Sequence, residues 1–404
     1  MIPRLKPYLD DEEVWMLFHS PHNAVQLFEE KFADSFGAKD ALAFPYGRSA
    51  LWAFFNALGI KGAEVVQPAY TCSVVAHATI LSGNTPVFVD CALTDYNMDY
   101  EMFARAITAK TRVVIPTHLF GYPMDTAKVN EIVREAEKRF GQRIYVIQDC
   151  AHSFEAESNG KSVIHAGDGA LFGLGISKQI TSIFGGMFTT NDDEIAASLR
   201  LWRDRNFEAS GWFRSIKRAL YLLAIYPAFN ETAYGLVYWL QEQTPLLNRL
   251  TKAYHLDEKI HFPPDYRVKM NRVEAGVGLV QLSKYLKIKN KRREIADKYF
   301  DELTPPANWV LPQKVKGATY SHFAIRVPDK APIIAYAAKK GIQLGQLIEY
   351  SIPHLPPYRE YIKNEAFSNS LYCSRHMINL PIHPGLDESK IEEIISVINN
   401  AGFG

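Results

Sequence analysis

Residues 144–153 read IYVIQDCAHS. The first four form a nearly continuous apolar run, which is typical of a strand buried on both faces of a parallel sheet. The run ends at Asp149, and His152 follows three residues later. Ligands of open α/β sheets bind beyond the carboxyl ends of the strands, so these two side chains are the first candidates for a functional site.

Short β-rich runs and helical stretches alternate on both sides of this segment. Seven such runs are Ala41–Phe44, Glu64–Pro68, Pro86–Asp90, Arg112–Pro116, Ile144–Asp149, Ala170–Leu174 and Gly186–Thr190. Helical patterns separate most of them, as at Ser49–Leu58 and Thr126–Phe140. Repeated strand–helix–strand units predict an α/β fold with a mostly parallel seven-stranded sheet covered by helices.

The pattern changes after residue 190. A long helix is expected over Val273–Leu303, of the kind that commonly links a large domain to a smaller one. We therefore expect a large domain over residues 1–285 and a smaller C-terminal α+β domain over residues 286–404. Residues 206–266 are expected to form an aromatic-rich helical insertion in the large domain.

The composition excludes several classes of protein. The 404 residues include 45 Lys and Arg against 44 Asp and Glu, a net charge of +1, so the basic surplus typical of nucleic-acid binding is absent. The four cysteines show no CxxC pair or metal-ligand spacing, which predicts no metal site and favours a reducing, cytoplasmic setting. No apolar run approaches the ~20 residues of a membrane span. We expect a soluble protein that at most lies on a membrane surface.

The turn Gly47-Arg48-Ser49 lies between a predicted strand and the helix that follows it. Glycine permits a tight turn, and free N–H groups at a helix start attract an anion such as phosphate. Taken alone, such a segment is more often an ordinary turn with an N-cap serine.

Asp149 and Lys178 have ordinary alternatives as well. A carboxylate after an apolar strand often caps the next helix, and a lysine in a turn such as Gly175–Gln179 is usually exposed. Together the two side chains fit pyridoxal phosphate (PLP), whose ring nitrogen is protonated against a carboxylate and whose aldehyde forms an imine with a lysine. The order of these segments, with His118–Gly121 after another strand, favours the cofactor.

These segments resemble the DegT-type (StrS-like) sugar aminotransferases, which are PLP enzymes with the aspartate aminotransferase fold (fold type I). The resemblance runs from about residue 25 to the C-terminus and is interrupted at 206–266. The motifs that carry it are Gly59–Val66, Pro86–Asp90, Tyr96–Asp99, His118–Gly121, Asp149–His152, Gly167–Ala170, Gly185-Gly186, Gln281-Leu282 and Leu380–Pro384.

The resemblance implies the catalytic residues of a PLP-dependent aminotransferase. Lys178 is expected to form the Schiff base with the cofactor and to transfer protons. Asp149 is expected to pair with the pyridine nitrogen, and His152 to lie over the cofactor ring. By the same resemblance, the expected amino donor is glutamate and the expected acceptor is a nucleotide-linked keto sugar.

The resemblance also implies how the cofactor phosphate is held. Gly47, Arg48 and Ser49 are expected to bind it through backbone N–H groups, the guanidinium and the hydroxyl. Members of the family are homodimers whose two active sites lie at the subunit interface, so a homodimer with shared sites is expected here.

Several cofactor positions depart from the family pattern. Relatives usually have Ser at the position of Gly173, and Ser177 is the nearby hydroxyl that can replace it. An aromatic usually stacks on the PLP ring at the position of Cys72, and Tyr70 is the candidate substitute. Arg267 matches an Asn that reaches the partner's cofactor phosphate, which arginine binds at least as well.

The insertion at 206–266 contains apolar and aromatic residues at helical spacing, with cations beside them. These residues are Trp212, Ile216, Leu220 and Leu223, with Arg214, Lys217 and Arg218. One interpretation is a helical hairpin packed on the dimer or over the active site. The other is a basic, aromatic surface over residues 211–240 that touches a membrane or an amphipathic substrate.

The departures, which include Ile183-Phe184 in place of Gly-Glu, predict a divergent member with an unusual substrate. Two alternatives therefore stay open. One is a PLP enzyme of another reaction type, or one that acts on a lipid-linked ketone. The other is a non-catalytic regulatory protein that retains the fold. Lys178 argues against the family's dehydratases, which carry His at this position.

Overall fold

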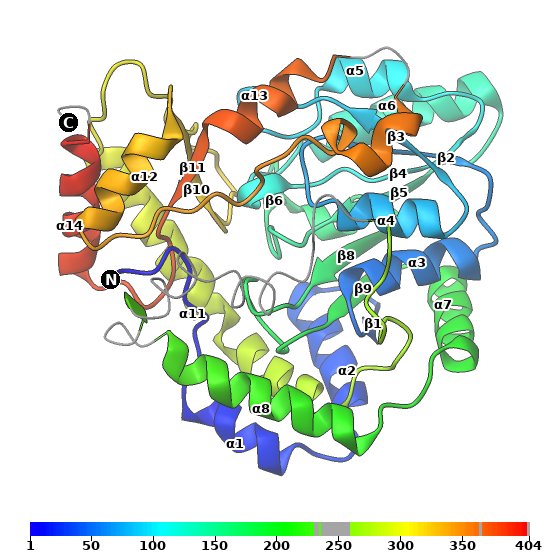
Figure 1. Ribbon diagram of the computed structural model, residues 1–404. Coiled ribbons are helices and arrows are strands. Elements are labelled where there is room, and N and C mark those ends of the chain that lie inside the picture. The colour runs from blue at the N-terminus through cyan, green and yellow to red at the C-terminus, as the bar shows by residue number, and fades with distance from the viewer. Residues whose placement is uncertain (230–233, 236–258, 363–365, 402–404) are drawn as a thin grey trace.

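The computed structural model describes residues 1–229, 234–235, 259–362 and 366–401. Helices cover both faces of a central sheet, and a smaller group of helices and strands near the C-terminus lies to one side (Figure 1). Part of the insertion expected at 206–266, including the end of the surface expected at 211–240, lies outside the described residues.

The central sheet has seven strands in the order β1-β9-β8-β5-β4-β2-β3. Strand β9 pairs antiparallel with both of its neighbours, while β8, β5, β4, β2 and β3 are parallel. This confirms the predicted α/β fold with a mostly parallel sheet. The strands are β1 (Asp40–Phe44), β2 (Glu64–Pro68), β3 (Thr85–Val89), β4 (Thr111–Val114), β5 (Tyr145–Asp149), β8 (Gly169–Gly173) and β9 (Gly186–Thr190).

The helices begin where polar side chains satisfy their free N–H groups. Asp125 accepts hydrogen bonds from the N–H groups of Ala127 and Lys128 at the start of α6, and Asp192 does the same at the start of α7. The helices before the C-terminal part are α1 (Asp11–His19), α2 (Ala24–Phe36), α3 (Gly47–Ala57), α4 (Val74–Leu81), α5 (Tyr100–Ala106), α6 (Thr126–Phe140), α7 (Asp193–Asn206), α8 (Trp212–Ala228) and α11 (Arg272–Glu302).

The C-terminal part builds its own apolar core around a two-stranded antiparallel sheet. Its elements are β10 (Phe323–Arg326), α12 (Lys330–Lys339), α13 (Ser368–His376), β11 (Met377–Leu380) and α14 (Glu388–Asn399). The end of α11 contributes Ile295 and Tyr299 to this core, and Ile2 from the N-terminus also packs there. Because α11 runs without a break through residue 285, the domain boundary placed there remains a prediction.

The topology gathers the ends of β4, β5 and β8 at one edge of the sheet. His118 follows β4, and its Nε2 lies 2.9 Å from Oε1 of Gln148 on β5, which ties the two strand ends together. Burial lowers the pKa of this imidazole to about 4, so it stays neutral at physiological pH. None of the helices among the described residues combines the length and the apolar character needed to cross a bilayer.

The packing of α2 on α11 depends on a glycine. A Cβ atom on Gly278 would lie 2.5 Å from Cζ of Phe28, which is fully buried. We expect Gly278→Val to lower the free energy of unfolding by about 2 kcal/mol through overpacking, as measured by urea unfolding. The control is Ser283→Val on the exposed face of the same helix, for which we expect a change within about 0.5 kcal/mol. Equal losses in the two variants would contradict this account of the helix contact.

Candidate active site

A cavity of about 600 Å³ lies at the carboxyl ends of β5 and β8. Eight of the eleven residues predicted for the site line it, and they come from strand ends and turns far apart in the sequence. They are Gly47, Arg48, Cys72, Asp149, His152, Gly173, Ser177 and Lys178. The fold therefore brings most of the predicted site together.

Asp149 is a buried carboxylate at the end of β5. Its Oδ1 accepts a hydrogen bond from the N–H of Ala151 at 3.1 Å, and its Oδ2 accepts one from Oγ1 of Thr117 at 3.3 Å. Burial raises the pKa of this carboxyl group, while the hydrogen bond from Ala151 and the charge of Lys178 act in the opposite direction. Such a carboxylate is stabilised by a cationic group bound in the cavity.

Lys178 faces the same cavity from the turn after β8. Its backbone N–H donates to the carbonyl of Gly175 at 2.9 Å, which closes the turn. Burial lowers the pKa of its amine, although the charges of Cys72 and Asp149 partly oppose the shift. A Cβ atom on Gly173 would lie 3.2 Å from Cε of Lys178. The missing side chain at residue 173 therefore leaves room for the lysine.

His152 lies in the cavity wall and is held as a neutral imidazole. The backbone N–H of Phe120 donates to its Nδ1 at 3.4 Å, so the ring proton of the neutral form is on Nε2. Burial lowers its pKa well below the usual value, and the charge of Lys178 adds to the shift. A neutral ring of this kind can lie against a flat cofactor without a charge of its own.

The N-terminus of α3 forms the anion-binding end of the cavity. Its N-cap residue, Tyr46, makes no side-chain capping bond to the helix, so the first N–H groups are not capped by a side chain. Gly47 lies close against β8, because a Cβ atom there would approach the carbonyl of Phe172 to 3.1 Å. Burial lowers the pKa of Arg48 to about 10, so its guanidinium remains charged at neutral pH. These groups suit a phosphate.

Three of the predicted residues are not in the cavity lining. The hydroxyl of Ser49 donates to the carbonyl of Tyr266 at 2.7 Å. The ring of Tyr70 lies in the core of the C-terminal part, where its hydroxyl donates to the carbonyl of Ile348 at 3.3 Å. The guanidinium of Arg267 lies 5.5 Å from the ring centroid of Tyr266.

Two residues at the site were not anticipated from the sequence. Tyr350 lines the cavity near Cys72, and its hydroxyl accepts a hydrogen bond from the N–H of Ser73 at 3.1 Å. His322 places its ring 5.1 Å from that of His152, between centroids. Both come from the C-terminal part of the chain, and none of the sequence motifs marks either of them.

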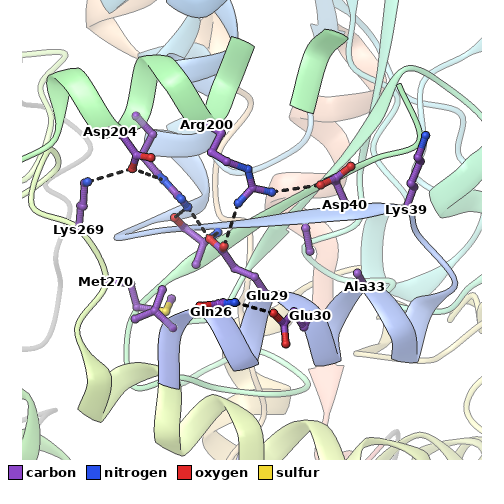
Figure 2. A pocket seen from close by; sticks show the side chains of 14 residues that line it. Gln26, Glu29, Glu30, Ala33, Lys39, Asp40, Arg200, Asp204, Lys269 and Met270 are labelled. Atoms are coloured by element: carbon purple, nitrogen blue, oxygen red, sulfur yellow. Dashed lines mark hydrogen bonds and ion pairs between the residues drawn. The ribbon is translucent and has the colours of Figure 1, made fainter. Parts of the chain in front are cut away.

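A second cavity, of about 560 Å³, lies between α2, β1 and α7 (Figure 2). Its charged side chains pair with one another: Arg200 contacts Glu29 at 3.4 Å and Asp40 at 3.1 Å. Lys269 contacts Asp204 at 2.9 Å. Arg203 also contacts Glu29. With Glu30 and Lys39 included, the lining contains four acidic and four basic residues. The balanced charges of this network hold the three elements together, so we assign the cavity a structural role.

Known proteins are similar to this chain in sequence and in fold. A model of the DegT/DnrJ/EryC1/StrS aminotransferase family matches residues 16–399. The GDP-perosamine synthase of Caulobacter vibrioides is 26% identical over 382 residues, covering 92% of this chain and 88% of the relative. The dTDP-3-amino-3,6-dideoxy-alpha-D-galactopyranose transaminase of Aneurinibacillus thermoaerophilus is 26% identical over 383 residues, covering 93% and 89%.

Solved structures have the same fold at lower sequence identity. A putative sugar aminotransferase from Streptococcus pneumoniae in its PMP form gives a TM-score of 0.77 at 20% identity and covers 100% of this chain and 99% of that chain. The sugar aminotransferase CalS13 from Micromonospora echinospora gives 0.78 at 18% identity, covering 99% and 100%. With the family match and the cavity geometry, these findings lead to one conclusion. The chain belongs to the DegT/DnrJ/EryC1/StrS aminotransferase family, and it is an aminotransferase whose cofactor is pyridoxal phosphate.

Proposed function

We propose that the protein transfers an amino group from glutamate to a nucleotide-linked keto sugar, with PLP held covalently by Lys178. The observation that carries the proposal is the pairing of a lysine amine and a buried carboxylate in one cavity. Lys178 and Asp149 both line it, and each shifts the pKa of the other. PLP enzymes use such a pair, the lysine for the Schiff base and the carboxylate as partner of the pyridine nitrogen.

The residues present fit the cofactor at each of its polar ends. Gly47 and Arg48 at the start of α3 would hold the phosphate. Asp149 would hold the protonated ring nitrogen, which supplies the counter-charge that this buried carboxylate needs. Bound PLP supplies an electron sink that stabilises negative charge on the reacting carbon.

Lys178 would perform the proton transfers of both half-reactions. Because burial lowers the pKa of its Nζ, more of the amine is unprotonated at neutral pH than in an exposed lysine. An unprotonated Nζ beside the reacting carbon can remove a proton and return it to the neighbouring position. His152, which is neutral, leaves this exchange to the lysine.

The acceptor class rests on the named relatives. By their names, one makes GDP-perosamine and another is a transaminase of a dTDP-linked amino sugar, which supports a nucleotide-linked keto sugar here.

We also propose a homodimer with shared active sites. It is supported by Arg267, which is exposed outside its own cavity lining and matches by the family resemblance an Asn that reaches the partner's cofactor phosphate. The four free cysteines support a cytoplasmic location.

A peripheral membrane contact is a second proposal, and it rests on the outer face of α8. Trp212, Phe213 and Leu220 are 65%, 64% and 59% exposed. The structure limits the expected basic character, because Arg214 and Arg218 turn inward with only 11% and 13% of their side chains exposed. Apolar insertion would therefore contribute more than charge to such a contact.

The first prediction concerns the donor half-reaction. The purified protein should show the visible absorbance band of lysine-bound PLP, and L-glutamate should shift it to the near-ultraviolet band of the pyridoxamine form. Lys178→Ala should lose the visible band, because no amine remains at that position to hold the cofactor. Absorbance spectra of both proteins, with and without L-glutamate, test this.

Other outcomes discriminate between the alternatives. A visible band that ignores glutamate would retain PLP but contradict the donor, and would favour another reaction type. Bound PLP without turnover of any amino donor or keto sugar would favour a non-catalytic role. A protein that takes up no PLP would contradict the proposal altogether.

The second prediction concerns Asp149. Asp149→Asn removes the charge that keeps the ring nitrogen protonated, so we expect kcat to fall at least about 100-fold while the cofactor still binds. The matched control is Asp192→Asn, because asparagine also caps a helix and α7 is remote from the cavity lining. Steady-state kinetics and the position of the absorbance band measure the effect. Equal activity of the two variants would contradict the role of Asp149.

The third prediction concerns the outer face of α8. If it inserts into lipid, Trp212→Glu with Leu220→Glu should abolish cosedimentation with phosphatidylglycerol vesicles. Leu201→Glu is the control, because Leu201 is 53% exposed on α7. A wild-type protein that stays in the supernatant would contradict the membrane contact.

A further inference from the structure

Helix α8 contributes to the wall of the cofactor cavity. It lies beside α1 and α11 below the sheet, in a segment that the sequence marks as an insertion (Figure 1). Tyr221 on its inner face lines the cavity together with Phe184 and Tyr46. We call these three residues the aromatic wall. The insertion therefore reaches the site within its own chain.

The rings of the aromatic wall pack on one another. The centroids of Phe184 and Tyr221 lie 5.0 Å apart, and those of Tyr46 and Phe184 lie 6.2 Å apart in an edge-to-face arrangement. All three side chains are half-buried, so part of each remains open to the cavity. Burial raises the pKa of Tyr46 to about 12 and raises that of Tyr221, so both hydroxyls are neutral. The wall is an uncharged surface of rings.

Arg218 of α8 holds this wall in place. Its Nη2 donates to the hydroxyl of Tyr46 at 3.1 Å and to Asp265 at 2.8 Å, and its Nε donates to Glu274 at 2.9 Å. Its guanidinium also lies 3.9 Å from the ring centroid of Phe184. One side chain thus contacts two of the three wall residues and two carboxylates, of which Glu274 is fully buried.

A second arginine fastens the same helix. Nη1 of Arg214 donates to the carbonyls of Val268 and Lys269 at 2.7 and 2.8 Å, and its Nε lies 3.2 Å from Asp265. The ion pairs of both arginines with Asp265 and Glu274, together with the two carbonyl contacts of Arg214, restrict the orientation of the helix. The inner face of α8 therefore presents Tyr221 to the cavity in a defined position.

A surface of neutral rings, tilted against one another, is suited to the C–H groups of a pyranose. The C–H groups of a sugar ring pack on aromatic faces through dispersion, and the positive edge of each C–H meets the negative face of the ring. A charged group such as a diphosphate gains nothing from this wall. Contacts of this kind would orient the sugar ring in the same cavity as Lys178.

We propose that the aromatic wall is the subsite that binds the sugar ring of the keto substrate, with Tyr221 as a specificity-determining residue and Arg218 as a positioning residue. This inference rests on the proposed function, since it assigns the sugar of that reaction to a surface of the cavity. It gives the insertion a role in substrate recognition that is separate from any membrane contact.

The test isolates the second half-reaction. Pyridoxamine-form holoenzyme is mixed with increasing concentrations of GDP-4-keto-6-deoxymannose or of a dTDP-linked 4-keto sugar, and the return of the visible band gives an apparent Kd and a maximal rate. Tyr221→Ala should raise the apparent Kd about tenfold or more and leave the maximal rate within about threefold. Tyr221→Phe should match the wild type, because the ring and not the hydroxyl makes the contact.

Two further variants separate recognition from folding. Tyr226→Ala removes a tyrosine from the same helix that is not in the cavity lining, and should leave the apparent Kd unchanged. Arg218→Lys keeps the charge but loses the planar fork, and should weaken sugar binding in the same way as Tyr221→Ala. Bleaching by glutamate should be unchanged in Tyr226→Ala, and the visible absorbance band of every variant reports bound PLP, so that loss of the cofactor can be told apart from loss of sugar binding.

The outcomes are distinguishable. An apparent Kd for Tyr221→Ala equal to that of the wild type would overturn the subsite and leave the proposed function standing. A wild-type enzyme that bleaches with glutamate but binds neither sugar would remove keto sugars from the proposed function and overturn the subsite with them. A protein that does not respond to glutamate would overturn the proposed function first.

Discussion

A buried carboxylate is the constraint on which this site is built. Asp149 ends a strand in the interior of the sheet, and its two hydrogen-bond donors are a backbone N–H and a threonine hydroxyl. These neutral donors satisfy its geometry but not its charge. The surrounding elements therefore bring positive groups to the same cavity, with Lys178 after the neighbouring strand and Arg48 at a helix start. The cofactor completes this balance of charge.

Much of the site could be predicted because it follows from the topology of the sheet. The strands, their alternation with helices and the residues after each strand are local features of the sequence, and parallel pairing then forces the strand ends together. This is why Asp149, Lys178 and His152 were identified. Ser49 was assigned to the phosphate by its position in the turn, and that role remains a prediction. In the structure its hydroxyl bonds to Tyr266, which is 217 residues away in the sequence.

The side-chain positions that the sequence did not indicate depend on contacts between distant parts of the chain. Tyr70 is two residues from Cys72, but its ring turns into the core of the C-terminal part. Tyr350 reaches the cavity from that part, at a position with no periodic pattern to mark it. The sequence also could not show which way the cations of the insertion face, because their partners are distant in the chain. Arg218 has the sequence context of a basic surface, yet its partners Asp265 and Glu274 lie 47 and 56 residues further on.

Phe184 and helix α8 of the insertion depend on each other for their packing. The ring at residue 184, where the family resemblance implies a carboxylate, is covered by Tyr221 and Arg218 of α8. Without the helix, the ring would be left against solvent. With the helix but a carboxylate at residue 184, the ring surface of the wall would be lost. If the aromatic wall is the sugar subsite, a transfer of α8 into another enzyme would have to bring the ring at residue 184 with it.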